Sequence, residues 1–409
     1  MKILMVFHAP PYPPDIGPSR RHYHVLMETV ARHDVTVLSL GSPVDRTALL
    51  DHTRLDPSRV HFVRGDRTPT RKALRAATCL ATARSDFCRL RRKGVQRRLD
   101  RLMAAESFDV VYFSTVMLGC YRLPRGVPLV GDTHNVEHDN LARAASTAPE
   151  GWRRLYYRVQ AALTKREERV HLRKFQIVCA TSARDRDVLK RLAPEASVRI
   201  VPNGIDLQKY SLRGDTGTER GLILFTGLMS YYPNVHAVLR FAKDVFPLIA
   251  RRVPAARFVV VGANPPATIR ALASDRIEIT GRVPDVRPYY ARASVAVVPL
   301  SIGGGTRVKV LESMATGVPV VSTALGCEGL DVAHEHSVLL ADSDQALADA
   351  VVRVLRSPVL ASSLSSHGRE VAVRYDWKRI APVFDDIVHA AAARGAPTMQ
   401  STAGACRAY

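Results

Sequence analysis

The chain of 409 residues lacks the defining features of several protein classes. Its few cysteines show neither C-x-x-C spacing nor a partner histidine pair, and lie at Cys79, Cys88, Cys120, Cys179, Cys327 and Cys406. This excludes a disulfide-built scaffold and a zinc module, and predicts free thiols in a reducing compartment. No apolar run approaches the roughly 18–20 residues of a membrane span. The apolar part of the opening MKILMVF is shorter than the ~7–15 residues of a secretory signal, so we expect a buried first strand and a cytoplasmic protein.

Acidic residues are scarce relative to basic ones, at 38 against 59, which gives a formal net charge of +21. Residues 1–200 hold 36 basic and 20 acidic side chains (net +16), whereas residues 201–409 hold 23 and 18 (net +5). Such a charge indicates partners rather than a fold, here nucleic acid, an anionic membrane surface or a phosphorylated substrate. Nucleic acid is disfavoured, because the densest basic run, 89–101, has no stacking aromatics and the chain shows no reader motif.

Short apolar runs alternate with longer amphipathic stretches along the whole chain. Most runs are uniformly apolar, which is typical of strands covered on both faces. Repeated strand–helix units of this kind predict an α/β fold with doubly wound parallel sheets. The predicted strands span residues 2–7, 35–40, 60–63, 110–113, 129–131, 177–180, 199–201, 222–226, 257–261, 277–280, 295–299, 318–322 and 338–340.

The strands fall into two sets, divided by a stretch near 201–221 that is rich in Gly, Asp, Thr and charge and indicates a linker. We predict two facing Rossmann-like domains, residues 1–202 and 203–376, with a final helix over 377–394 that returns to the first domain. Residues 395–409 are small and polar, and are predicted to be disordered. Ligands of open α/β sheets bind beyond the carboxyl ends of the strands, so an interdomain cleft would form there.

The segment 297–323, VVPLSIGGGTRVKVLESMATGVPVVST, is the most informative stretch of the chain. A buried strand is followed by three glycines and by a helix predicted over 306–316. Glycine lets backbone amides approach a phosphate closely at the start of a helix. The residues that we expect around such a phosphate are Gly303, Gly304, Gly305 and Thr306.

Two cations follow this glycine loop. Arg307 stands in the first turn of the predicted helix, where a cation opposes the helix dipole, so a bound anion would account for it. Lys309 and Glu312 are three residues apart and share a face. The alternative interpretation is an exposed arginine beside a Lys309–Glu312 surface pair.

Three other glycines directly follow predicted strands or open helices. Gly17 precedes a helix predicted to begin near Arg20, whose free amides could bind an anion. Gly227 and Gly281 follow strands of the second domain and support a nucleotide site there. The alternatives are an ordinary proline-rich loop for Gly17 and tight turns for the other two.

The segment DTHNVEHDN, residues 132–140, is densely polar for the end of a strand. One interpretation places His134 in the cleft, directed at a reacting group. Another is a solvated loop in which Asn135 or Asp139 caps the next helix. A metal site on His134 and His138 is also conceivable, although no third ligand is evident.

Taken together, these segments resemble the family-4 (group 1) retaining glycosyltransferases, whose two facing Rossmann-like domains form the GT-B fold. The resemblance covers nearly the whole chain and is carried by DTHNVEHDN, ATSARDRDVL, VPNGID, FTGLMSYYPN, GRVPDVRPYY, GGGTRVKVLESMATGVPVVST and YDWKRI. It implies sugar transfer from a UDP- or GDP-linked nucleotide-sugar donor without a cofactor or an essential metal. It also implies a glycan or lipid-linked acceptor, in the synthesis of cell-envelope or extracellular polysaccharide.

The resemblance assigns roles to particular residues. The nucleotide base would pack near Gly281–Val283, and Glu312 would hold the ribose hydroxyls. Arg307, Lys309 and the loop amides would neutralise the diphosphate. His134 would contact the transferred sugar, and the acceptor would bind mainly to the first domain.

The sequence departs from the family pattern in two places. Many members carry two glutamates at the glycine-loop helix, and the first would fall at Gly304. The usual Arg and Lys after Gly227 are also absent, which fits their relocation to Arg307 and Lys309. We expect loop amides to hold the donor sugar instead. A non-catalytic scaffold of the same fold and a nucleotide-sugar epimerase are the alternative functions.

The basic first domain predicts peripheral association with an anionic membrane, since each Lys or Arg near such a surface contributes about 1 kcal/mol. The stretches 84–101 and 152–174 are the predicted contacts. The alternative is a solvated arginine-rich face.

Overall fold

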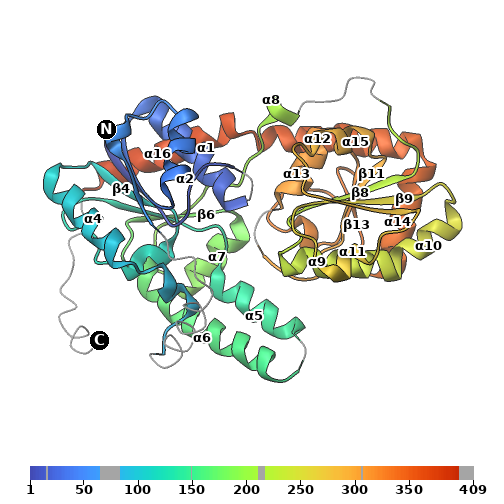
Figure 1. The fold of residues 1–409 in the computed structure, drawn as a ribbon, viewed down its shortest axis with the longest axis horizontal. Helices are drawn as coiled ribbons and strands as arrows, with labels where there is room; N and C mark the ends of the chain where they lie inside the picture. Colours follow the sequence, from blue (N-terminus) through green and yellow to red (C-terminus); the bar gives the residue numbers. More distant parts are fainter. Residues whose placement is uncertain (15–16, 65–82, 149, 211–216, 305–306, 396–409) are drawn as a thin grey trace.

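The computed structural model describes residues 1–14, 17–64, 83–148, 150–210, 217–304 and 307–395. They form two α/β domains joined end to end, each built around one sheet (Figure 1). Every strand pairing within the two sheets is parallel. The predicted fold class, two doubly wound parallel-sheet domains, is therefore confirmed.

The first sheet has seven strands in the order β3-β2-β1-β4-β5-β6-β7. Its central strand β1 is buried from Ile3 to Phe7, and Ile3 lies opposite Val35 of β2 and Val110 of β4. Helices cover both faces, which is why these runs are continuously apolar. The strands are β1 (Lys2–Phe7), β2 (Asp34–Leu40), β3 (Val60–Val63), β4 (Val110–Phe113), β5 (Leu129–Asp132), β6 (Ile177–Ala180) and β7 (Val198–Ile200).

The second sheet has six strands in the order β10-β9-β8-β11-β12-β13. The strands are β8 (Leu222–Thr226), β9 (Arg257–Val261), β10 (Ile277–Gly281), β11 (Val295–Val298), β12 (Val320–Ser322) and β13 (Leu339–Leu340). All thirteen predicted strands occur in the predicted order, with ends shifted by one or two residues at most.

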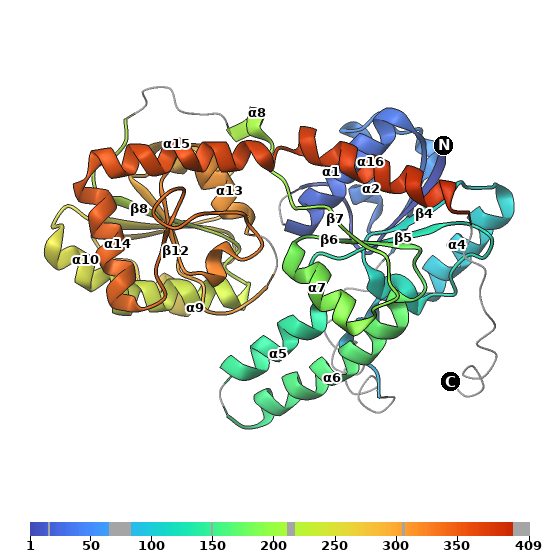
Figure 2. The same cartoon turned by 180° about the vertical axis from the view of Figure 1, so that it is seen from behind.

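The helices of the first domain include a long hairpin, α5–α6, that projects away from the sheet (Figures 1 and 2). The α-helices are α1 (Gly17–Arg32), α2 (Pro43–Asp51), α4 (Lys93–Ala105), α5 (Glu137–Thr147), α6 (Trp152–Leu172) and α7 (Ala183–Leu192), and the 3₁₀ turns are η1 (Pro57–Arg59), η2 (Asp86–Leu90) and η3 (Val116–Cys120).

The second domain is preceded by the short helix α8 (Leu207–Tyr210). Its further helices are α9 (Tyr232–Arg240), the π-helical turn η4 (Phe241–Val245), α10 (Phe246–Arg252), α11 (Ala267–Arg270), α12 (Arg287–Arg292), α13 (Val308–Ala315), the 3₁₀ turn η5 (Leu325–Cys327), α14 (Asp344–Arg356) and α15 (Pro358–Arg374). The last helix, α16 (Trp377–Ala393), leaves this domain and packs along α1 of the first (Figure 2). There the ring of Trp377 stacks on His24 at a centroid distance of 4.9 Å.

Two further features of the chain concern its cysteines and its helices. Cys88 forms a disulfide bond, so the prediction of a free thiol is wrong at that position, whereas Cys120, Cys179 and Cys327 are free. Among the described residues, helices with the length and apolar character of a membrane span are absent. The predicted tail lies, from residue 396 onwards, outside the described residues.

Candidate functional site

Each sheet has a switch point, where the strand order turns back beside the domain's first strand: between β1 and β4, and between β8 and β11. Ligands of doubly wound sheets bind in the crevice at that point. The residues beyond these strands, such as His8 after β1, Gly227 after β8 and Gly303 after β11, therefore form the candidate site. Gly305 and Thr306, which the sequence placed in it, lie outside the described residues.

The glycine loop meets the first domain closely. Gly303 has a φ of 104°, a left-handed conformation that favours glycine. At Gly304 an added Cβ would lie 1.9 Å from Oδ1 of Asn140 on α5. A side chain at position 304 would therefore require the end of the Asn140 side chain to shift while the domains are in this arrangement, which gives the departure from the family pattern a steric reason.

Arg307 is the residue before α13, which begins at Val308, two residues later than predicted. Its side chain is 92% buried, so the alternative of an exposed arginine is wrong. Nη1 donates to the Gly304 carbonyl at 2.6 Å. Nε and Nη2 are buried and make no hydrogen bond of good geometry in the described part of the chain, although the Tyr231 hydroxyl lies close enough to favour the charged guanidinium. Burial lowers the Arg307 pKa. Unsatisfied buried donors on a cation are costly, and a bound anion would satisfy them.

Lys309 lies at the carboxyl end of β8. Its Nζ donates to Oδ1 of Asn234 at 2.9 Å and sits 4.0 Å from the ring centroid of Phe225. An added Cβ at Gly227 would lie 2.8 Å from this Nζ, so the glycine lets the lysine approach the strand end. Burial, and then the charge of Arg307, lower the Lys309 pKa to about 7. No ion pair with a described carboxylate neutralises either cation.

Glu312 does not pair with Lys309, so the predicted alternative of a surface pair is wrong. Its carboxylate is buried and accepts three donors. The hydroxyl of Tyr210 donates to Oε1 at 2.8 Å and that of Tyr290 to Oε2 at 3.0 Å, while Nη1 of Arg20 forms an ion pair with Oε1. Because Arg20 belongs to α1, this ion pair joins the two domains.

Sequence reasoning missed the role of Arg20, although a signal was present. Arg20 stands in the first turn of α1, where a cation opposes the helix dipole as Arg307 does. The helix begins at Gly17 rather than near Arg20, and an added Cβ at Gly17 would meet nothing within 4 Å.

Gly281 and Val283 lie at the end of β10, the edge strand two places from β8. The structure thus brings Gly227 to Lys309 and leaves Gly281 and Val283 at the sheet edge.

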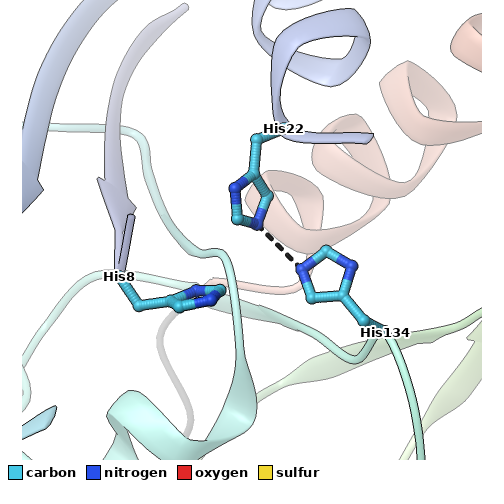
Figure 3. Close-up of side chains that lie close together, drawn as sticks. All are labelled: His8, His22 and His134. Carbon is cyan, nitrogen blue, oxygen red and sulfur yellow. Dashed lines mark hydrogen bonds between the residues drawn. The ribbon is translucent and has the colours of Figure 1, made fainter. Parts of the chain in front are cut away.

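His134 belongs to a cluster of three histidines (Figure 3). Its Nε2 lies 2.8 Å from Nε2 of His22 in α1, so one imidazole donates and the other accepts. His8, after β1, completes the cluster, with its Nδ1 2.9 Å from Oγ of Ser114. Burial is the main cause that lowers the pKa of His8 to about 3, of His134 to about 4 and of His22 well below its usual value. All three rings are therefore neutral near pH 7.

The segment around His134 is anchored by a carboxylate that the sequence did not reveal. Glu168 of α6 accepts from the backbone N–H of Glu137 at 2.9 Å and of His138 at 3.1 Å, at the start of α5. It also accepts from Nδ1 of His138. The helix therefore has no side-chain cap from Asn135 or Asp139, and Nδ1 of His138 is occupied by Glu168. Burial and the nearby Glu168 raise the Glu137 pKa to about 8.

A buried ion pair fixes the strand end beneath this segment. Arg21 donates from Nε to Oδ2 of Asp132 at 2.7 Å and from Nη2 to Oδ1 at 2.9 Å, and both side chains are fully buried. The hydroxyl of Tyr112 donates to the same carboxylate at 2.8 Å. Nη1 of Arg21 also donates to the carbonyls of Val201 and Pro202. The pair therefore holds α1, β5 and the chain leaving β7 in one position.

A second set of ion pairs joins the domains. Glu328, in the second domain, accepts two hydrogen bonds of 3.0 Å from Arg143 of α5 and forms an ion pair with Arg184 of α7 at 3.1 Å. Both arginines also pair with Asp139, at 3.0 and 2.6 Å. Nη1 of Arg143 additionally donates to the Gly303 carbonyl at 3.3 Å. The glycine loop is thus held against the first domain.

Comparison with known families and curated proteins gives consistent matches. Residues 17–209 match the family model described as Glycosyltransferase Family 4, and residues 220–357 match that described as Glycosyl transferases group 1. The chain is 28% identical over 195 residues to a phosphatidyl-myo-inositol mannosyltransferase of Mycobacterium leprae, covering 44% of this chain and 50% of the relative. It is 31% identical over 187 residues to the putative teichuronic acid biosynthesis glycosyltransferase TuaC of Bacillus subtilis, covering 43% of this chain and 46% of the relative. The chain thus spans about half the length of the curated relatives it matches.

Solved structures share the fold along nearly the whole chain. A sucrose-phosphate synthase from Thermosynechococcus elongatus superimposes with a TM-score of 0.71 at 17% identity, covering 96% of this chain and 100% of that one. Anabaena Alr3699/HepE in complex with UDP and glucose gives a TM-score of 0.67 at 14% identity, covering 95% of this chain and 100% of that one. At these identities the likeness establishes the two-domain arrangement and no more.

Proposed function

Because the chain belongs to the group 1 and family 4 glycosyltransferases, we propose that it transfers a sugar from a UDP- or GDP-linked donor to a glycan or lipid-linked acceptor, with retention at the sugar carbon. HepE is a solved relative in fold that binds UDP and UDP-glucose, which supports a nucleotide-sugar donor. The relatives named for teichuronic acid synthesis and for inositol lipids support a cell-envelope acceptor.

The observation that carries this proposal is the pair of buried cations beside the glycine loop. When the bond from the sugar carbon to the diphosphate breaks, negative charge develops on the leaving oxygen and positive charge on the sugar. In this proposal, the buried guanidinium of Arg307 and Nζ of Lys309 stabilise the leaving diphosphate. Preorganised cations of this kind typically contribute about 3–4 kcal/mol each to the transition state. The cations fill the electrostatic role that a metal has in other sites, so we propose that no metal is essential.

His134 and Glu312 complete the proposed site. His134 is neutral and half-buried at the carboxyl end of β5, where it can hydrogen-bond to the transferred sugar. Attack by the acceptor from the face that the diphosphate leaves needs no enzyme nucleophile. The carboxylate of Glu312 already accepts from three donors. If Glu312 binds the ribose hydroxyls, Arg20 must release it first. Donor entry and separation of the two domains would then be coupled through this ion pair.

A thermal-shift measurement with nucleotides tests the donor site. We expect UDP or GDP to raise the melting temperature with EDTA present, because a ligand that binds only the folded state at 100 times its Kd adds about 2.7 kcal/mol of stability. Lys309→Met should lose most of the shift. Lys243→Met, at an exposed position of the second domain, should keep it. Equal shifts in both variants, or none with any nucleotide diphosphate, would contradict the proposed site.

The scaffold and epimerase hypotheses make different predictions. The scaffold hypothesis depends on the missing glutamate at position 304, and the close approach of Asn140 supplies another reason for glycine there. A scaffold would show neither transfer nor donor hydrolysis with any common nucleotide sugar. An epimerase would form a new nucleotide sugar without an acceptor, and chromatography of the reaction mixture distinguishes the two.

We also propose that the α5–α6 hairpin rests on an anionic membrane. Helix α6 exposes Trp152, Leu155, Val159 and Val170, with exposed fractions of 73%, 64%, 37% and 48%. At 100° per residue these side chains share one face. Exposed cations stand on and beside that face, at Arg158, Lys165, Arg166 and Arg169. An apolar stripe flanked by cations is typical of helices that lie in the membrane interface.

Vesicle flotation tests the hairpin. Replacing the four cations by glutamine should weaken binding to phosphatidylserine vesicles at least tenfold, because each contributes about 1 kcal/mol near an anionic surface. The matched control removes four exposed cations of the second domain, Arg220, Lys243, Arg251 and Arg276, and should bind as the wild type. Equal binding of the wild type to phosphatidylcholine alone would contradict the electrostatic contact.

A further inference from the structure

Three separate segments bring histidines together at the first switch point (Figure 3). His8 follows β1, His22 lies in α1 and His134 follows β5, and one ligand nitrogen of each lies within 4.8 Å of the other two. We propose that these imidazoles form a binding site for a divalent transition metal of the zinc class, and that its occupation inhibits sugar transfer. The inhibition rests on the proposed function, whereas the metal site does not.

The arrangement of the rings suits a shared ligand. The ring of His22 is inclined by 87° to that of His8 and by 63° to that of His134. Rings inclined in this way can direct nitrogens at one centre, which stacked rings cannot. Around a tetrahedral Zn²⁺ with Zn–N bonds of about 2.0–2.1 Å, the nitrogens would be about 3.3 Å apart. The Nε2 atoms of His22 and His134 are 2.8 Å apart, and the ligand nitrogen of His8 lies within 4.8 Å of both. Metal binding would therefore widen the first distance by about 0.5 Å and shorten those to His8 by up to about 1.5 Å.

The surroundings of His8 match those of a metal ligand. Its Nδ1 bonds to Oγ of Ser114 at 2.9 Å, and its backbone N–H donates to the same oxygen at 3.0 Å. This contact orients the ring and leaves Nε2 for a metal, as the hydrogen-bond partners of metal-ligating histidines do. His22 and His134 hydrogen-bond to each other and both interact with the backbone of Ser114. In the described residues, Nδ1 of the buried His22 has no partner.

Three neutral protein ligands would leave a fourth coordination position open, for water or an anion. The charge of the neighbouring Arg21 disfavours a permanently held cation, although its partner Asp132 offsets part of that charge. We therefore infer reversible binding. A metal on His134 would remove that imidazole from the transferred sugar, and inhibition follows from this competition.

The metal-free full-length chain, titrated with Co²⁺, tests the site directly, because tetrahedral Co²⁺ absorbs visible light far more strongly than the hydrated ion. We expect one such site in the wild type. His8→Gln and His22→Gln should each weaken binding at least tenfold. The control is His389→Gln, which alters the other described group of three candidate ligands, His33, Asp385 and His389. Thermal melting without metal shows whether each variant is folded, and the half-buried His8 is the less disruptive site of the two.

The outcomes separate the two parts of the proposal. Loss of the Co²⁺ band in folded His8→Gln but not in His389→Gln supports the site, and the reverse pattern or no band in the wild type overturns it. Inhibition by Zn²⁺ that EDTA reverses, and that is weakened in His8→Gln, supports the competition. Co²⁺ binding without inhibition overturns that part alone. A chain that binds Co²⁺ but transfers no sugar under any condition contradicts the proposed function and leaves the metal site standing.

Discussion

Replacing Lys309 by methionine is expected to lower kcat for sugar transfer by about 10²–10³-fold, the usual loss when one preorganised group at a developing negative charge is removed. Methionine keeps the unbranched stem beside Phe225 and removes the charge together with the hydrogen bond to Asn234. Stability should not fall, since the ammonium is desolvated and lies close to the charge of Arg307. Initial rates with the donor identified by thermal shift, together with the melting temperature, check both statements.

The pH profile separates a charge effect from a packing effect. The Lys309 pKa is lowered to about 7, and a lysine is charged below its pKa. The cation is therefore lost as pH rises through 7 in the free enzyme, and kcat/KM should fall on the alkaline side. Lys309→Met has no such proton to lose, so its residual activity should be flat there. An unchanged alkaline limb in the variant would assign the titration to another group.

The elements of this fold could be predicted from sequence because their signals are local. A parallel strand buried on both faces is a continuous apolar run, as in residues 2–7, and its partner strands need not be known. The start of α13 is less well defined in sequence, because three glycines, Thr306 and a cation precede it and the helix begins only at Val308. Arg307 could be singled out for the same reason, since it stands against a helix dipole within its own segment, and its role toward a donor stays a prediction.

The contacts of the site that the sequence did not predict join residues that are far apart in the chain. Arg20 and Glu312 are separated by 292 positions, and nothing near Glu312 indicates that a cation from the other domain will occupy it. His22 lies mid-helix, where a histidine gives no sign of its partner 112 residues later. The start of α5 is likewise capped by Glu168 from α6, 31 residues after Glu137, rather than by a nearby Asn or Asp. Such pairs are set by the packing of whole elements, which local patterns do not encode.

Replacing Asp132 by alanine is expected to have the largest effect on stability, about 3–5 kcal/mol, because it leaves the guanidinium of Arg21 buried without its counter-charge. Both side chains are fully buried, so water cannot compensate for the loss. Tyr112 loses an acceptor at the same time. Urea unfolding at pH 7, followed by circular dichroism, measures the change in the transition of the first domain.

The matched control is Asp100→Ala, which breaks an exposed pair with Arg122 in the same domain. Exposed pairs contribute about 1 kcal/mol or less. A loss in Asp132→Ala no larger than in this control would show that the buried pair does not stabilise the fold.

The double variant Arg21→Met, Asp132→Leu distinguishes the charge from the packing. Removing both partners of a buried pair eliminates the uncompensated charge, and apolar replacements of similar volume are often neutral. Here the double variant should recover only part of the loss, because Nη1 of Arg21 also satisfies the carbonyls of Val201 and Pro202. Recovery to wild-type stability would mean that those carbonyls find other donors. A residual loss of about 1–3 kcal/mol, the usual penalty for buried polar groups left unpaired, would show that Arg21 also holds the chain between the two domains against β5.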